Sequence, residues 1–82
     1  MPAGTLFIVA TPIGNLGDMT LRAIETLKEV SAVLSEDTRV TSKLLKHFEI
    51  EKSLISFHEH TDQKKAMSLV ERLEKGESFA LV

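Results

Sequence analysis

The sequence contains no cysteine, tryptophan or tyrosine among its 82 residues. The absence of cysteine excludes disulfide bonds and zinc sites built on thiolate ligands. No apolar run approaches the roughly 20 residues that a membrane-spanning helix requires. The N-terminus also lacks the basic start and the small-residue cleavage site of a secretory signal. We therefore expect a cytoplasmic protein that makes no use of a membrane.

Neither sign of charge is in clear excess, because ten Lys and Arg residues face twelve Asp and Glu residues, for a net charge of -2. A self-contained nucleic-acid binder normally shows a basic excess, so the balance argues against one. It leaves room for an RNA-modifying enzyme whose basic surface lies elsewhere. Hydrophobic residues make up 43% of the chain and charged residues 27%, which is typical of a globular domain.

Short apolar runs alternate with longer segments of helical periodicity along the whole chain. The first run, residues 5–10, is continuous and rich in β-forming residues, which is typical of a strand covered on both faces of a parallel sheet. We predict further strands at residues 32–35, 54–57 and 78–82, and helices at residues 20–30, 41–48 and 63–75. The side chains expected to face the core from these helices are Leu21, Ile24, Leu27, Val30, Val40, Leu44, Leu45, Phe48, Ala66, Met67, Val70 and Leu73.

The order βαβαβαβ predicts an α/β fold with an open parallel sheet of about four strands. Because the chain stops inside the apolar run at residues 78–82, we expect residues 1–82 to be an incomplete N-terminal half-domain. Open parallel sheets bind ligands outside the carboxyl ends of their strands. The loops at that edge are residues 11–19, 36–40 and 58–62.

The first of these loops carries Gly14 and Gly17 after Pro12. Glycine lets a backbone turn tightly and approach a ligand closely, and the following helix offers free N–H groups. The loop lacks the first glycine of G-x-G-x-x-G and has no G-K-[ST], so dinucleotide and P-loop sites are excluded. From spacing alone, a tight turn without a ligand is as good an interpretation as a binding loop.

The second loop places two adjacent carboxylates, Glu36 and Asp37, at the end of a predicted strand. Carboxylates at this edge can orient a sugar hydroxyl or draw off its proton. The alternative is a helix cap, with Asp37 or Thr38 accepting main-chain N–H groups. The residues alone favour the cap.

The third loop reads His58-Glu59-His60, which invites comparison with a metal site. Residues two apart supply at most two ligands, and His47 lies on a helix remote from this edge. We therefore predict no bound metal. A contact with substrate and an exposed polar loop both remain open for His58 and His60.

Longer stretches around the three loops carry a resemblance to a known family. Residues 7–16, continuing through Asp18-Met19-Thr20-Leu21-Arg22-Ala23, resemble the first motif of the tetrapyrrole methylase superfamily, the class III S-adenosylmethionine-dependent methyltransferases. Residues 35–39 and 56–60 are similar to later motifs of its branch that acts on small-subunit ribosomal RNA. The superfamily usually has G-x-G-P-G-D in the first loop, where this chain has Ile13 in place of the proline and Asn15 in place of the aspartate. That departure favours RNA over a porphyrin-like substrate.

The resemblance implies an enzyme that uses S-adenosylmethionine to methylate a ribose 2′-hydroxyl of small-subunit rRNA, with a small-molecule methylase or a non-catalytic α/β binding module as alternatives. It implies cofactor contacts from Pro12, Ile13 and Gly14. Glu36 and Asp37 are then the candidate bases. The expected substrate contacts are Asn15, Arg39, His58 and His60. It also implies a homodimer at full length and a second, C-terminal domain that completes the cofactor site, so we expect residues 1–82 alone to be inactive.

Overall fold

The computed structural model describes residues 3–10, 16–58 and 60–82. In chain order, the elements are β1 (Leu6–Ile8), the 3-10 turn η1 (Leu16–Asp18), α1 (Leu21–Glu29), β2 (Ala32–Ser35), α2 (Thr38–His47), β3 (Ser53–Ser56), α3 (Gln63–Glu74) and β4 (Phe79–Leu81). The strands pair in parallel in the order β1-β4-β2-β3. The predicted open parallel α/β sheet is therefore confirmed.

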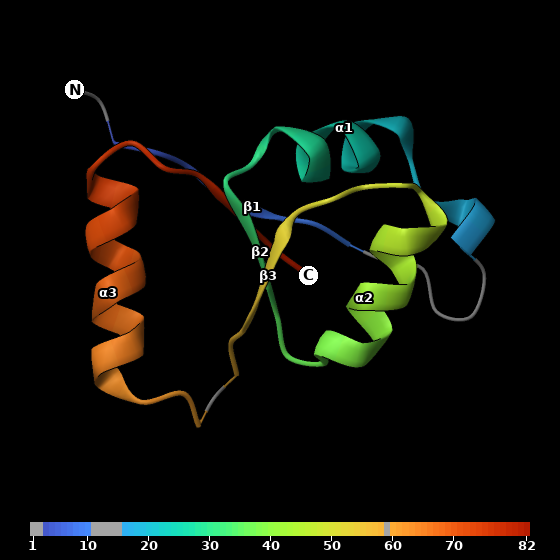
Figure 1. Ribbon diagram of the computed structural model, residues 1–82. Helices are drawn as coiled ribbons and strands as arrows, with labels where there is room; N and C mark the ends of the chain where they lie inside the picture. The colour runs from blue at the N-terminus through green and yellow to red at the C-terminus, as the bar shows by residue number, and fades with distance from the viewer. Residues whose placement is uncertain (1–2, 11–15, 59) are drawn as a thin grey trace.

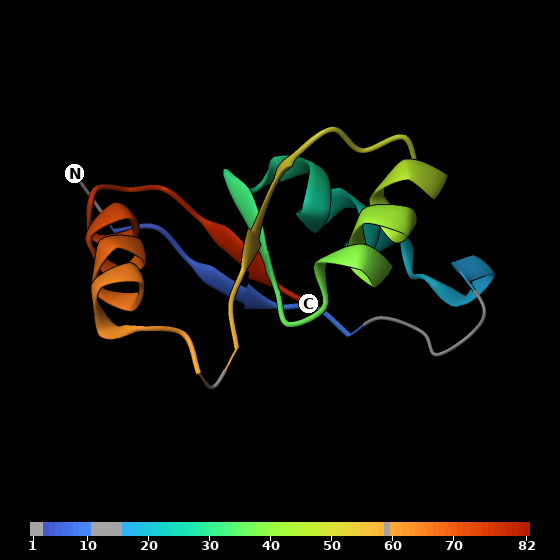
Figure 2. The same ribbon diagram turned by 60° about the horizontal axis from the view of Figure 1, so that its bottom comes forward.

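Helices cover the two faces of the sheet unequally: α1 and α2 lie on one face and α3 lies on the other (Figures 1 and 2). On the first face Leu27 and Leu44 pack with Val33 of β2. On the second face Leu69 packs with Phe79 of β4. All four residues of β2 are buried, because the strand has neighbours on both sides and helices above and below. Within the described ranges, no helix is long and apolar enough to cross a membrane.

Each helix begins at a side-chain cap that accepts otherwise unpaired main-chain N–H groups. Thr20 Oγ1 accepts the N–H of Ala23 at 3.0 Å, and Asp62 Oδ1 accepts that of Lys65 at 2.8 Å. Asp37 caps α2 in the same way. This cap starts α2 at Thr38, three residues earlier than periodicity predicts.

The carboxyl ends of α2 and α3 both close with a residue in the left-handed region. After α3 the N–H of Gly76 donates to the carbonyl of Leu73 at 3.0 Å, and that of Glu77 donates to Arg72 at 3.1 Å. Gly76 has φ of 102°, a conformation that glycine adopts without a steric penalty at the end of a helix. After α2 the same role falls to Glu49, with φ of 55°.

The core expectation is wrong at four helical positions, which are exposed: Leu21, Val40, Met67 and Val70. Leu21 is 78% exposed and Val40 62%, because both lie off the buried stripes, which pass through Leu27 in α1 and through Thr41, Leu44 and Leu45 in α2. In α3 the buried stripe passes through Leu69, which the periodicity analysis left out. Contact with the sheet therefore buries the face of α3 that carries Leu69 and leaves Met67 and Val70 exposed.

The first strand also differs from its prediction. It is shorter than residues 5–10, and its side chains are exposed on the sheet rather than covered on both faces: Ile8 is 74% exposed. Among the described residues β1 pairs with β4 alone, which makes it an edge strand. An apolar run thus marks a strand correctly here, without placing it at the centre of the sheet.

Candidate functional site

The path of the chain opens a crevice at the carboxyl ends of β2 and β3. These strands are neighbours, but the chain leaves β2 for α2 on one face and leaves β3 for α3 on the other (Figure 2). In open α/β sheets, ligands bind where neighbouring strands send their connections to opposite faces. The loops that leave this point contain Glu36 and His58.

A cleft of about 620 Å³ lies at this point, and its walls come from the ends of all four strands. Apolar side chains form most of its lining, and three polar residues interrupt them. A volume of this size and such a mixture are typical of small-molecule sites. The lining residues are Ile8, Val9, Glu36, Phe57, His58, Thr61, Ala66, Leu81 and Val82.

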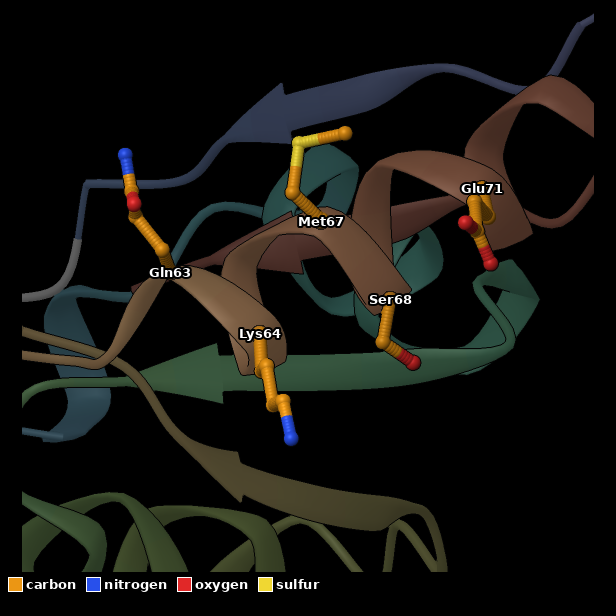
Figure 3. A pocket seen from close by; sticks show the side chains of 5 residues that line it. All are labelled: Gln63, Lys64, Met67, Ser68 and Glu71. Carbon is orange, nitrogen blue, oxygen red and sulfur yellow. The ribbon is translucent and has the colours of Figure 1, made fainter.

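A second hollow, on the outer surface of α3, is a poorer candidate. Its lining comes from a single helix, and the side chains spread away from one another rather than converging (Figure 3). One helical face cannot enclose a ligand, and among the described residues those of the loops after the strands are not part of its lining. The lining residues are Gln63, Lys64, Met67, Ser68 and Glu71. The strand-end cleft is therefore the candidate site.

The two carboxylates of the acidic loop, Glu36 and Asp37, have different surroundings. Asp37 Oδ1 accepts the main-chain N–H of Arg39 at 3.1 Å and that of Val40 at 3.4 Å, so this carboxylate caps α2. Glu36 instead lines the cleft. The capping interpretation of Asp37 is confirmed, and the use of either carboxylate as a base stays a prediction. Arg39 is exposed on the first turn of α2, outside the lining of the cleft.

A buried pair of hydroxyl groups forms hydrogen bonds that hold this loop in place. Ser35 Oγ and Thr41 Oγ1 lie 2.6 Å apart, with residue exposures of 1% and 3%. Ser35 also donates to the carbonyl of Asp37 at 2.9 Å. Because that carbonyl can only accept and a hydroxyl has one hydrogen, Thr41 is the donor within the pair. The pair was not anticipated from the sequence, although a serine at the end of a buried strand and a threonine in the next helical turn are its signal.

The histidine loop is a compact turn held by its own side chains. Thr61 Oγ1 accepts the N–H of His58 at 2.8 Å, while Thr61 N–H donates to His58 O at 3.0 Å. The N–H of His60 donates to Nδ1 of His58 at 3.1 Å, so the neutral His58 ring carries its proton on Nε2. His58 and Thr61 both line the cleft, and Thr61 was not anticipated from the sequence.

His60 is exposed, with its ring centroid 6.1 Å from that of His58. Within the part of the chain that the structure describes, no group of three or more His, Cys, Asp or Glu residues is placed to hold a metal ion.

The expected cofactor loop lies mostly outside the described residues. The structure does not describe four residues for which roles were predicted: Pro12, Ile13, Gly14 and Asn15. Their roles stay predictions. The strand that leads into the loop is described. The main-chain N–H of Val9 donates a hydrogen bond to the carbonyl of Leu81 at 2.9 Å. Because Val9 also lines the cleft, the chain enters the loop at the candidate site.

One ion pair shifts the pKa values of its partners at the turn between α3 and β4. Arg72 binds Glu77 through two bonds, Nε to Oε2 at 3.0 Å and Nη2 to Oε1 at 2.9 Å. This pairing lowers the pKa of the Glu77 carboxyl and raises the pKa of the Arg72 guanidinium. The guanidinium also lies 4.9 Å from the ring centroid of Phe79. The pair joins the end of α3 to the start of β4, away from the carboxyl edge that holds the cleft.

A sequence profile described as Tetrapyrrole (Corrin/Porphyrin) Methylases matches residues 5–82. The chain belongs to this family. The expected membership is therefore confirmed, and the tetrapyrrole methylases are S-adenosylmethionine-dependent methyltransferases.

Within the family, the chain is similar to proteins named ribosomal RNA small subunit methyltransferase I. It is 53% identical over 79 residues to the one from Halalkalibacterium halodurans, covering 96% of the chain and 27% of that protein. It is 55% identical over 80 residues to the one from Streptococcus pyogenes serotype M1, covering 98% of the chain and 28% of that protein. For the one from Bacillus subtilis (strain 168) the identity is 52% over 79 residues, covering 96% and 27%. The chain thus spans little more than a quarter of the length of these relatives.

Proposed function

We propose that the protein carrying this chain transfers a methyl group from S-adenosylmethionine to a ribose 2′-hydroxyl of small-subunit rRNA. The observation that carries the proposal is identity of 52–55% with several relatives named for methylation of small-subunit rRNA. The cleft adds support, because Glu36 and His58 come from two separate motifs and line the same space. We expect the reaction to take place in the cytoplasm, and we expect the full-length protein to act as a homodimer with a second domain.

The cleft fits part of the cofactor. Its apolar walls suit the uncharged parts of a nucleoside, and Glu36, His58 and Thr61 supply polar groups at its rim. When bound, S-adenosylmethionine supplies a methyl group already activated by its sulfonium centre. Val9 and Leu81 would then contact it, together with the predicted Pro12, Ile13 and Gly14.

The contribution of the chain's own residues is alignment and proton removal. A ribose hydroxyl is a weak nucleophile, so holding it in line with the methyl group gives much of the acceleration. Glu36 is the better base of the acidic pair, because it faces the cleft whereas the carboxylate of Asp37 is engaged by two main-chain N–H groups. His58 and His60 would position the substrate, with Arg39 and the predicted Asn15.

The proposal is tested by mass analysis of rRNA from a strain that lacks the full-length gene. We expect one ribose to lose its methyl group and to regain it when the intact gene is returned. A gene with Glu36→Gln should restore methylation at least about tenfold more slowly, as expected for loss of a general base. Glu51→Gln, at an exposed carboxylate outside the cleft lining, serves as the matched control. Unchanged ribose methylation in the deletion strain would overturn the proposal.

A further inference from the structure

The three helices share an unusual start, since each has a cation at its second residue. These residues are Arg22 in α1, Arg39 in α2 and Lys64 in α3, and Lys65 follows directly in α3. None of the three first turns contains an acidic residue. We call these four side chains the rim cations.

This arrangement works against helix stability. The amino end of a helix carries partial positive charge, so carboxylates are favoured there and cations are disfavoured. Helix starts are accordingly enriched in Asp and Glu. The rim cations therefore gain no electrostatic stabilisation from the helices that hold them. A ligand outside the helices explains their position better than the stability of the fold does.

Topology brings the rim cations to the edge that holds the cleft. In a parallel sheet each helix starts just after the carboxyl end of a strand. The starts of α2 and α3 lie on opposite faces of the sheet (Figure 2), and Arg39 and Lys64 are the second residues of these two helices. Arg22 lies beside the exposed edge strand, in a groove shared with Ile8 and Val9.

The rim cations are available for an outside partner. Arg22, Arg39 and Lys64 are exposed, Lys65 is half-buried, and none of them forms an ion pair with any residue that the structure describes. Figure 3 shows the side chain of Lys64 extending away from α3.

The nearby acids lie in the segments that precede the helices, separate from the turns that carry the rim cations. The carboxylates of Asp37 and Asp62 accept main-chain N–H groups within their own helix caps. Glu36 lines the cleft, and Asp18 lies in η1. The acids thus lie in the loops and caps, while the rim cations lie on the first turns of the helices. This edge of the sheet therefore carries both signs of charge at separate positions.

We propose that the rim cations bind the phosphate backbone of RNA on either side of the nucleotide held in the cleft. Spread over three helices, they match a chain of separated negative charges better than they match a single small anion. Contacts of this kind supply affinity and register but read no sequence. The inference rests on the proposed function and adds to it the surface that holds the substrate. Of these residues, only Arg39 was expected from the sequence to meet the substrate.

The test compares two triple variants with the parent protein. The rim variant combines Arg22→Gln, Arg39→Gln and Lys64→Gln. The control variant makes the same change of charge at the other ends of the same helices, at the exposed residues Lys28, Lys46 and Lys75.

Binding of a labelled single-stranded RNA oligonucleotide is followed by fluorescence anisotropy over a range of salt concentrations. We expect the rim variant to bind at least about tenfold more weakly, with a slope of log affinity against log salt that is smaller by about 2, since each single-strand phosphate contact contributes about 0.7. The control should stay within about twofold of the parent.

Thermal unfolding supplies a second, opposite readout. The rim variant loses unfavourable charge at helix starts and should melt at or above the parent temperature, while the control loses favourable charge at helix ends and should melt below it. Equal loss of RNA affinity in both variants, or no RNA binding by the parent, would overturn the inference. Selective loss of RNA binding in a protein that methylates no rRNA would leave the inference standing and remove the proposed function.

Discussion

Gly4 stands where the chain has no room for a side chain. A Cβ built at Gly4 overlaps the main-chain carbonyl of Glu77 and lies 3.1 Å from the carbonyl carbon of Gly76. Both neighbours are main-chain groups, so no side-chain rotation can relieve the contact. Gly4→Ala must therefore move the segment that leads into β1 away from the turn that leads into β4.

The cost of this movement follows from the hydrogen bonds on the same segment. Gly4 N–H donates to Leu73 O at 2.7 Å, and Thr5 N–H donates to Ser78 Oγ at 2.9 Å. At about 1 kcal/mol for each bond, loss of both destabilises the protein by about 2 kcal/mol. That is a large share of the roughly 5–15 kcal/mol that holds a typical domain together.

Urea unfolding, followed by circular dichroism, measures the effect. With a slope of about 1 kcal/mol per molar urea, typical of a small protein, Gly4→Ala should lower the midpoint by about 2 M. Ala3→Ser, at the exposed neighbouring residue, is the control and should stay within about 0.5 kcal/mol. A Gly4→Ala midpoint equal to that of the control would show that the segment has room, and the close approach would not constrain the fold.

Three further predictions concern other parts of the fold. Glu49→Gly should raise the free energy of unfolding by about 0.5–1 kcal/mol, because Glu49 has φ of 55°, and a rise in urea midpoint would show it. Thr41→Val leaves the buried Ser35 hydroxyl without its donor and should cost about 1–3 kcal/mol in urea unfolding; a double variant with Ser35→Ala should cost less than the sum of the single changes. Because Arg72 lowers the pKa of Glu77, the stabilisation from this pair is present above the unfolded carboxyl pKa of about 4.3 and is lost as pH falls through the lower folded value. Melting temperatures of the parent and of Glu77→Gln should therefore differ at neutral pH and converge in strong acid, and a constant gap would contradict the assignment.

The order and type of the elements could be predicted from the sequence because each carries its own local pattern. Whether a strand lies at the centre or at the edge of the sheet could not be predicted, since this depends on which strands become neighbours. Strand β1 has the composition of a central strand and lies at the edge, while β4 enters between β1 and β2. The prediction of which face of α3 is buried failed for a similar reason. Met67 and Leu69 are both apolar, and contact with the sheet decides which of them is buried.

The candidate site was predictable to the level of loops. Parallel strands end at one edge, so Glu36 and His58 could be expected near one another before their contacts were known. Which residue would cap α2 depended on the start of the helix, a choice that the sequence left open between Asp37 and Thr38. Thr61 was hidden because its part in the turn arises from a hydrogen bond to His58 that composition does not reveal.

The central position of β4 also has a consequence for synthesis on the ribosome. Among the described strands β1 pairs with β4 alone, and the hydrogen bond between Thr5 and Ser78 spans 73 residues. Until β4 emerges, β1 is an unpaired apolar segment, which is the kind of segment that aggregates or attracts chaperones. The nascent chain can form the α1–β2–α2–β3 unit early, but it must keep β1 out of wrong pairings until β4 is synthesised and pairs with it.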